Sequence, residues 1–182
     1  VPAPAAQAAL ARLLGAPDLP RVLHDAKRSE VLLATLGLEL GPSRHDTLLM
    51  SYLLDPEARH GLEALCAREL GGSPVGRADV ATAARGKRVD LAGPATPALA
   101  RLVGGQAPWL LRLCDRLEPR LADERLTALY ERVELPLARI LARMELAGVL
   151  VDHGRLRDLG EHIDAELGRL EQEARRVAGR DF

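Results

Sequence analysis

Two aspartates open predicted helices, and they are the residues whose type and position could do chemistry. Asp25 follows the short apolar run "RVLH", and Asp46 precedes "TLLMSYLL". A carboxylate at the end of a strand is a common metal ligand, and two-metal hydrolysis of a phosphodiester needs several such carboxylates. The same positions suit a helix N-cap, whose side chain accepts a backbone N–H and is worth about 1 kcal/mol over alanine. For both aspartates the cap is the simpler interpretation.

The other residue types that bind metals form no recognisable site. His24, His45 and His60 are too scattered for the spacing of a zinc site. His153 and His162 lie nine residues apart on one predicted helix, which places them on different faces, more than two turns apart. Surface positions are the better interpretation for these two.

Composition limits the class of protein. The 182 residues, 47% of them hydrophobic, fit one domain or two small ones with a packed core. A formal net charge of −1 implies no strong bulk attraction to nucleic acid or membrane. One Trp, two Tyr and one Phe are too few for a base-stacking platform.

Targeting signals and cysteines favour a cytoplasmic location. The start "VPAPAAQAAL" lacks the features of a signal peptide, and no apolar stretch approaches the ~20 residues of a membrane span. Cys66 and Cys114 belong to no CxxC pattern and are interpreted as reduced thiols on helices. We expect no membrane partner.

Periodicity and turn residues predict a mostly α fold with a few short strands. Gly37 suits the C-cap of the helix that Asp25 opens. Ser73 to Pro97 has weak periodicity and predicts a long connection with little regular structure. The expected elements are helices over 5–14, 26–36, 47–54, 61–72 and 97–117, the last interrupted at 104–108, and short strands over 21–24 and 38–41.

Two amphipathic helices are predicted after residue 121. Pro136 should kink the first, because an interior proline removes a backbone donor and costs roughly 3 kcal/mol. Gly148 ends it, and Asp152 is a plausible N-cap for the second, which ends at Gly179. The first stripe comprises Leu126, Leu129, Val133, Leu137, Ile140, Leu141 and Met144, and the second comprises Leu156, Leu159, Ile163, Leu167, Leu170, Ala174 and Val177.

Three stretches in order resemble the bacterial DNA polymerase I family (family A DNA polymerases). "LYERVELPLARILARMELAGVLVD" resembles the segment that joins the family's exonuclease-like domain to its polymerase domain. "HDAKRSEVLLATLGLEL" and "HDTLLMSYLLDPEARHGLEAL" resemble the second half of its 3′–5′ exonuclease domain. The resemblance is collinear and covers nearly the whole chain. The matching residues of the first stretch and beyond are Glu134, Leu135, Pro136, Leu137, Met144, Glu145, Gly148, Val149, Val151, Asp152, Ala178, Gly179 and Phe182.

The resemblance implies a division into two domains. Residues 1–118 would be the C-terminal part of an RNase H-like (exonuclease-like) α/β domain. Residues 119–182 would begin the polymerase domain, with the last helix at the base of the thumb. The implied function is a part in DNA replication and repair synthesis by a DNA-directed DNA polymerase. The implied partners are DNA, through the parent polymerase, and the remainder of the polymerase domain.

The resemblance also implies a degenerate nuclease site. The family's Asp-x-Glu strand would precede Val1, and its Asn-x-x-Tyr-Asp motif falls on "RVLHD", where Asp25 keeps the last acid and Arg21 replaces the asparagine. Its Tyr-x-x-x-Asp motif falls on "LVGGQ", where Leu102 replaces the tyrosine and Gln106 the aspartate. We therefore predict no catalytic residue, no metal site beyond the vestigial Asp25, and no cofactor in this segment. Mg²⁺ is expected for the parent polymerase.

Two basic patches are candidates for contact with the DNA backbone. Lys87 and Arg88 lie in "ARGKRVD", and Arg175 and Arg176 lie in "EARRVAGR". A solvated loop is the simpler interpretation of the first patch. The second is equally explained by thumb contact with DNA and by favourable placement of cations at a helix C-terminus.

Two alternative functions remain. One is a 3′–5′ exonuclease completed by acids from another chain, for which Asp115 is the nearest acid to Gln106 in this one. The other is a stand-alone helical module whose last helix docks on a partner protein.

Overall fold

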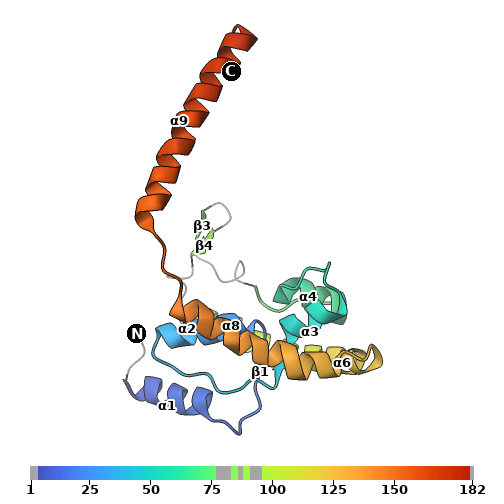
Figure 1. The fold of residues 1–182 in the computed structure, drawn as a ribbon. Coiled ribbons are helices and arrows are strands. Elements are labelled where there is room, and N and C mark those ends of the chain that lie inside the picture. The colour runs from blue at the N-terminus through green and yellow to red at the C-terminus, as the bar shows by residue number, and fades with distance from the viewer. Residues whose placement is uncertain (1–3, 77–82, 86–87, 91–95, 181–182) are drawn as a thin grey trace. The chain divides into compact units, whose positions relative to one another are not determined.

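The computed structural model describes residues 4–76, 83–85, 88–90 and 96–180. These residues divide into two compact units, Val1–Leu146 and Ala147–Phe182, and each is described by itself. Figure 1 shows the elements. In chain order they are α1 (Pro4–Gly15), β1 (Val22–Leu23), α2 (Ala26–Thr35), β2 (His45–Asp46), α3 (Thr47–Leu54), α4 (Leu62–Leu70), β3 (Ala83–Arg85), β4 (Arg88–Asp90), α6 (Thr96–Asp123), α7 (Thr127–Leu129), the π-helix η1 (Tyr130–Glu134), α8 (Leu135–Ala147) and α9 (His153–Ala178).

The mostly helical fold class is confirmed, but the second strand was misplaced. β1 pairs in parallel with β2, with Val22 opposite His45 and Leu23 opposite Asp46. The predicted strand over 38–41 is absent. Gly37 takes a φ of 70° and the Leu38 N–H returns to the Leu33 carbonyl, so the apolar side chains that follow close the end of α2 and become buried.

The core of the first unit lies where α3, α4, α6 and η1 meet. Its apolar side chains come from segments far apart in the sequence, and α6 contributes half of the buried ones, which makes it the central helix of this core. The buried members are Met50, Leu65, Cys66, Leu113, Cys114, Leu117, Leu121 and Tyr130.

The predicted interruption at 104–108 is wrong, because α6 is continuous across it. Pro108 lies inside the helix, and so does Pro119. Leu102, Leu113 and Leu117 bury the same side of the helix at 6% exposure or less. Burial of this stripe outweighs the local cost of glycine and proline. The helix also runs across the predicted domain boundary at 118, which stays a prediction.

The connection over 73–97 contains more regular structure than predicted. β3 and β4 pair antiparallel, with Ala83 opposite Asp90 and Arg85 opposite Arg88. Lys87 lies outside the described residues.

A π-turn precedes Pro136, where the sequence predicted a kink, and the kink itself stays a prediction. Arg125, with a φ of 61°, separates α6 from α7, and η1 then occupies the five residues before Leu135. Leu126 packs against the core, whereas the rest of the first predicted stripe is 38–62% exposed.

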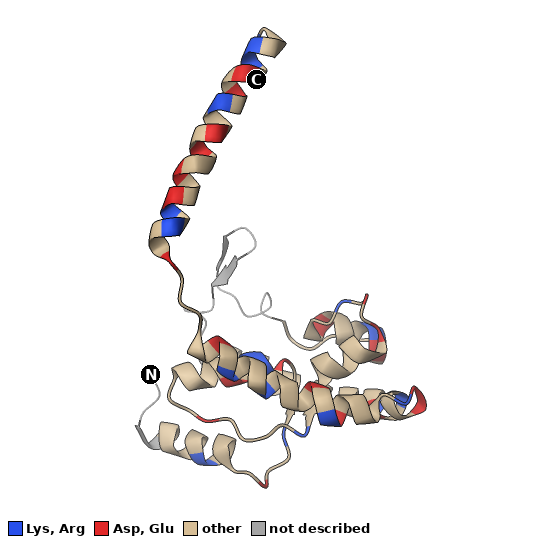
Figure 2. Ribbon diagram, in the orientation of Figure 1, with Lys and Arg blue, Asp and Glu red and all other residues tan. Residues whose placement is uncertain are grey.

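The second unit consists mainly of α9, as predicted. The Asp152 carboxylate accepts the Arg155 N–H, and Gly179 closes the helix at a φ of 67°. Its apolar stripe is exposed, with Leu156, Leu159, Ile163, Leu167 and Leu170 between 47% and 55%. Acidic and basic residues alternate along the other faces (Figure 2). In the described ranges, no helix combines the length and the apolar character that crossing a membrane requires.

Candidate functional site

The parallel pairing of β1 and β2 brings the two sequence-predicted aspartates together. Asp25 follows β1 and Asp46 ends β2, so both lie at the carboxyl ends of neighbouring strands. The Asp25 N–H donates to Asp46 Oδ1 at 3.1 Å, which fixes the two residues side by side. This is the arrangement in which a metal ligand pair could form.

Backbone N–H groups donate hydrogen bonds to both oxygens of the Asp46 carboxylate. Oδ1 also accepts the Leu48 N–H at 2.9 Å, and Oδ2 accepts the Ala26 N–H at 2.7 Å. The residue is 2% exposed. A carboxylate offers about four acceptor positions, and here they serve the first turns of both α2 and α3. The N-cap predicted for Asp46 is confirmed, and its carboxylate also joins a second helix.

Asp25 is likewise a helix cap, as predicted. Its Oδ1 accepts the Arg28 N–H at 3.1 Å. The residue has a φ of 66°, a left-handed conformation that aspartate tolerates better than most side chains. Its carboxylate therefore has a structural role at the start of α2.

His24 lies beside the two aspartates and is held neutral. Its Nδ1 is 2.9 Å from the Thr47 hydroxyl. Burial lowers the pKa of His24 below its usual 6.5, and the nearby Asp46 and Asp25 carboxylates oppose this only in part. At neutral pH the ring is uncharged and bridges the two strand ends.

Arg21 acts as an internal clamp. This residue stands where the resembled motif has asparagine, and it is only 8% exposed. Its guanidinium donates to the carbonyls of Leu13, Ala16 and Leu19 at 2.9, 2.6 and 3.0 Å. It thus fixes the end of α1 to the start of β1, and it is not available to a ligand.

The third motif position is also occupied by structural residues. Leu102 is 6% exposed, and Gln106 donates to the Val75 carbonyl at 3.4 Å. Asp115 is exposed on α6, nine residues beyond Gln106. Nine residues of helix span about 13 Å and half a turn more than two full turns, so Asp115 does not replace an acid at that position. Across the described residues no three His, Cys, Asp or Glu side chains gather as a metal site would require.

Sequence reasoning missed Tyr130, which belongs to the same buried cluster. Its hydroxyl accepts the Asp46 N–H at 2.8 Å, and its ring stacks on His45 with centroids 6.5 Å apart. Burial raises the pKa of Tyr130 above its usual value. The position of this tyrosine six residues before Pro136 carries no recognised site pattern, and only the fold shows that it reaches β2.

The basic candidates belong to other elements than this cluster. Arg175 and Arg176 are exposed in the last turn of α9. Arg88 begins β4. Their contact with DNA stays a prediction.

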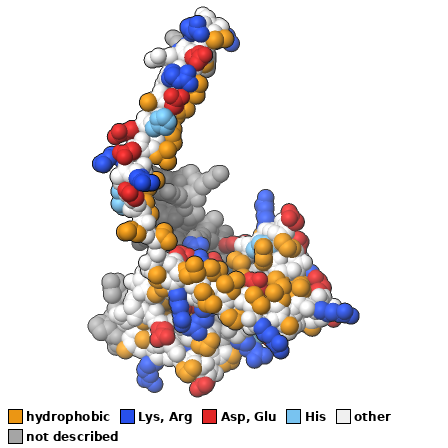
Figure 3. All heavy atoms as spheres, viewed as in Figure 1, with side chains coloured by type: hydrophobic (Ala, Val, Ile, Leu, Met, Phe, Trp, Pro, Cys, Tyr) orange, Lys and Arg blue, Asp and Glu red, His pale blue; other side chains and the backbone are white. Residues whose placement is uncertain are grey.

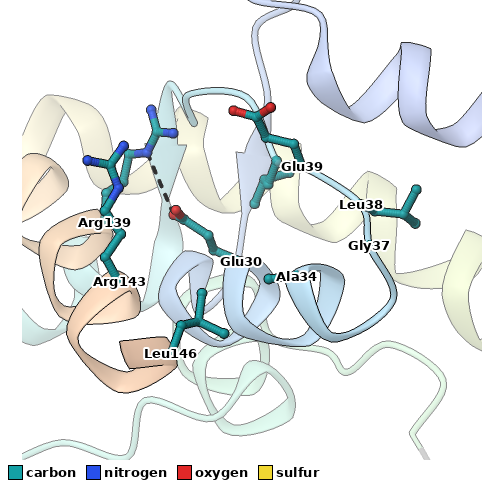
Figure 4. A pocket seen from close by; sticks show the side chains of 9 residues that line it. Glu30, Ala34, Gly37, Leu38, Glu39, Arg139, Arg143 and Leu146 are labelled. Atoms are coloured by element: carbon teal, nitrogen blue, oxygen red, sulfur yellow. Dashed lines mark ion pairs between the residues drawn. The ribbon is translucent and has the colours of Figure 1, made fainter. Parts of the chain in front are cut away.

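An open pocket of about 310 Å³ lies between α2, the chain after it and α8 (Figure 4). Arg139 lies 3.6 Å from Glu30, and Arg143 and Glu39 also line the space. Two guanidinium groups opposite two carboxylates leave no net charge, so the pocket has no charge preference for an anionic ligand.

The sequence and fold match one group of proteins. The protein-family model described as "DNA polymerase I, ribonuclease H-like domain" matches residues 3–81. DNA polymerase I of Bacillus subtilis is 33% identical over 88% of this chain and 18% of its own length. The thermostable DNA polymerase I of Thermus thermophilus is 37% identical over 86% of the chain and 16% of its own length.

A solved structure agrees with these relatives. The chain matches the POL domain of Pol1 from M. smegmatis, in complex with DNA primer-template and dNTP, with a TM-score of 0.74 and 30% identity. The match covers 100% of this chain and 28% of that one, and the chain spans under a fifth of the curated relatives quoted above. By sequence and by fold, this chain belongs to the bacterial DNA polymerase I family, which consists of family A DNA polymerases, and it corresponds to a segment of its members.

Proposed function

We propose that this segment serves DNA synthesis by a family A polymerase as a scaffold without nuclease activity of its own. The exonuclease-like residues would support the helices that follow them, and α9 would be a thumb helix that supports duplex DNA. The observation that carries the scaffold role is the Asp46 carboxylate, which is buried and bonded to the first turns of two helices.

Electrostatics supports the absence of nuclease chemistry. Two divalent ions about 4 Å apart need several carboxylates to offset their charge. Asp46 is already bonded to backbone N–H groups, Gln106 is neutral, and Leu102 is in the core. An exonuclease site would have to take nearly all of its ligands from residues outside this sequence.

Charge at the end of α9 supports a role with DNA. Arg175 and Arg176 place two guanidinium groups in the last helical turn, where they can reach phosphate oxygens. The M. smegmatis relative was solved with a DNA primer-template. DNA synthesis, Mg²⁺ use and a cytoplasmic location are parts of this proposal.

The thumb role is tested in the polymerase that carries this segment. Arg175→Ala with Arg176→Ala should raise the Kd for primer-template about 5- to 50-fold and reduce the salt slope of log Kd by about 2, because two phosphate contacts are lost. Arg169→Ala is the matched control, since Arg169 lies on the same helix and pairs with Glu166 and Glu173. If the double variant and the control bind DNA alike, α9 does not use these arginines.

The scaffold role has a separate test in metal binding. Titration of the chain with Mn²⁺ should give the same negligible heat for wild type and for Asp25→Asn, because Asp25 acts as a cap. A clear loss of binding in the variant would show a working ligand and refute the scaffold.

A further inference from the structure

The buried side of the helical segment from Tyr130 to Ala142 is aligned only because of η1. Tyr130, Ala138 and Ala142 are 2%, 8% and 0% exposed. In an unbroken α-helix, with about 100° per residue, Ala138 would lie about 80° out of line with Tyr130. The Leu135 N–H instead bonds to the Tyr130 carbonyl, a π-type bond that inserts one extra residue into the turn. The insertion removes about 100°, and the two residues come within about 20° of each other.

An α-helical turn at the same place would bury different side chains. The residues in line with Tyr130 would then be Leu137 and Leu141, seven and eleven positions later. These leucines are 38% and 39% exposed in the structure. The π-turn therefore directs two alanines inward and two leucines outward, although the leucines are the more hydrophobic pair. Figure 3 shows hydrophobic side chains exposed on the viewed face of the first unit, where α8 lies.

One constraint on the π-turn is Pro136. In an α-helix its ring would clash with the Arg132 carbonyl, and it has no N–H to donate there. The wider π-turn relieves that conflict immediately before the proline.

A second constraint is the hydrogen bond between Tyr130 and Asp46. The Asp46 N–H donates to the tyrosine hydroxyl at 2.8 Å, and the Asp46 side chain is itself fixed to α2 and α3. This bond sets the rotation of the helical segment before the turn. Ion pairs of Arg139 with Glu30 and of Glu145 with Lys27 set the rotation after it.

We propose that η1 is a register switch, a turn that can adopt the π form seen here or an α form, and that Pro136 and the Tyr130–Asp46 hydrogen bond together hold the π form. In the α form Leu137 and Leu141 turn toward the core. In the π form the outward apolar face of α8 includes Ile140 and Met144, at 52% and 62% exposure. In the α form a different set of side chains makes up that face. The switch thus decides which face α8 offers to a neighbouring surface.

The test is a pair of substitutions in this chain, with the register read by NMR couplings across hydrogen bonds. Wild type, Tyr130→Phe and Pro136→Ala should all show coupling from the Leu135 N–H to the carbonyl carbon of residue 130. With both substitutions, the coupling should move to the carbonyl carbon of Glu131. A double variant that keeps the π coupling overturns the proposal, and so does a shift produced by Pro136→Ala alone.

A control and a second measurement keep the test decisive. Tyr52 is 47% exposed, so Tyr52→Phe with Pro136→Ala removes a hydroxyl without the constraint and should keep the π coupling. If the double variant does not fold, alkylation of a cysteine placed at Ala138 decides the matter, because residue 138 is 8% exposed in the π form and turns outward in the α form. Adding Pro136→Ala to Ala138→Cys should raise the alkylation rate at least ten-fold while the buried Cys66 and Cys114 stay unmodified, and an unchanged rate overturns the proposal.

Discussion

At the scale of single residues, the Asp46 carboxylate was a candidate metal ligand by its position in the sequence. In the structure it is an acceptor of hydrogen bonds from the backbone. Asp46 is buried and receives N–H groups from Asp25, Ala26 and Leu48. The sequence predicted its cap on α3 but not its bonds to α2, because those depend on a strand pairing across 20 residues of chain. Arg21 is a similar case, since its carbonyl partners are set by the fold and not by a local pattern.

The two aspartates should differ in their effect on stability. Asp46→Asn leaves one acceptor oxygen and places an NH₂ group against backbone donors, so the free energy of unfolding should fall by about 2–4 kcal/mol. Asp25→Asn keeps a good N-cap and should change it by less than about 0.5 kcal/mol. Urea unfolding of both variants measures this, and equal effects would contradict the structural role of Asp46.

The buried histidines predict how stability depends on pH. Burial lowers the pKa of His24 and of His45 in the folded protein, and Glu118 and Glu131 oppose the shift at His45 only in part. The unfolded chain therefore binds protons more readily, and stability is complete above the ordinary pKa of 6.5 and falls as pH drops below it. Urea midpoints at about pH 7.5 and about pH 5 should show this loss. His45→Gln should reduce the slope, and an unchanged slope in His24→Gln with His45→Gln would refute this origin.

At the scale of elements, helix ends were predictable and breaks were not. Asp25, Asp46 and Asp152 begin helices and Gly179 ends one, as their residue types indicate. The continuous α6 and the π-turn were not predicted, because both depend on packing against the core. The apolar stripe predicted for α8 is mostly exposed for the same reason. It was derived from a period of 3.6 residues, which takes no account of the residue inserted by the π-turn.

Glycines inside α9 predict a gain in helix stability. A Cβ at Gly160 or Gly168 meets nothing within 4 Å, so alanine at either position should stabilise the helix by roughly 0.5–1 kcal/mol. Gly179 has a φ of 67°, and Gly179→Ala should weaken the same helix. Amide exchange along α9 distinguishes these effects. Slower exchange in Gly179→Ala than in wild type would contradict the cap assignment.

At the scale of the whole molecule, the family could be recognised from three ordered stretches, and sequence and fold comparisons agree with it. The resemblance also predicted that Leu102 and Gln106 hold no ligand role, and this stays a prediction. The use of Asp46 and Tyr130 to connect the exonuclease-like residues to η1 could not be predicted. It arises from contacts between residues 84 positions apart.

The central claim is that the carboxylates of this segment hold helices together and do not cut DNA. The most direct measurement is a 3′-end degradation assay on 5′-labelled single-stranded DNA with Mg²⁺ or Mn²⁺, using this chain and Asp25→Asn. We predict no shortening of the DNA by either protein. Metal-dependent shortening by the wild-type chain that Asp25→Asn abolishes would contradict the claim.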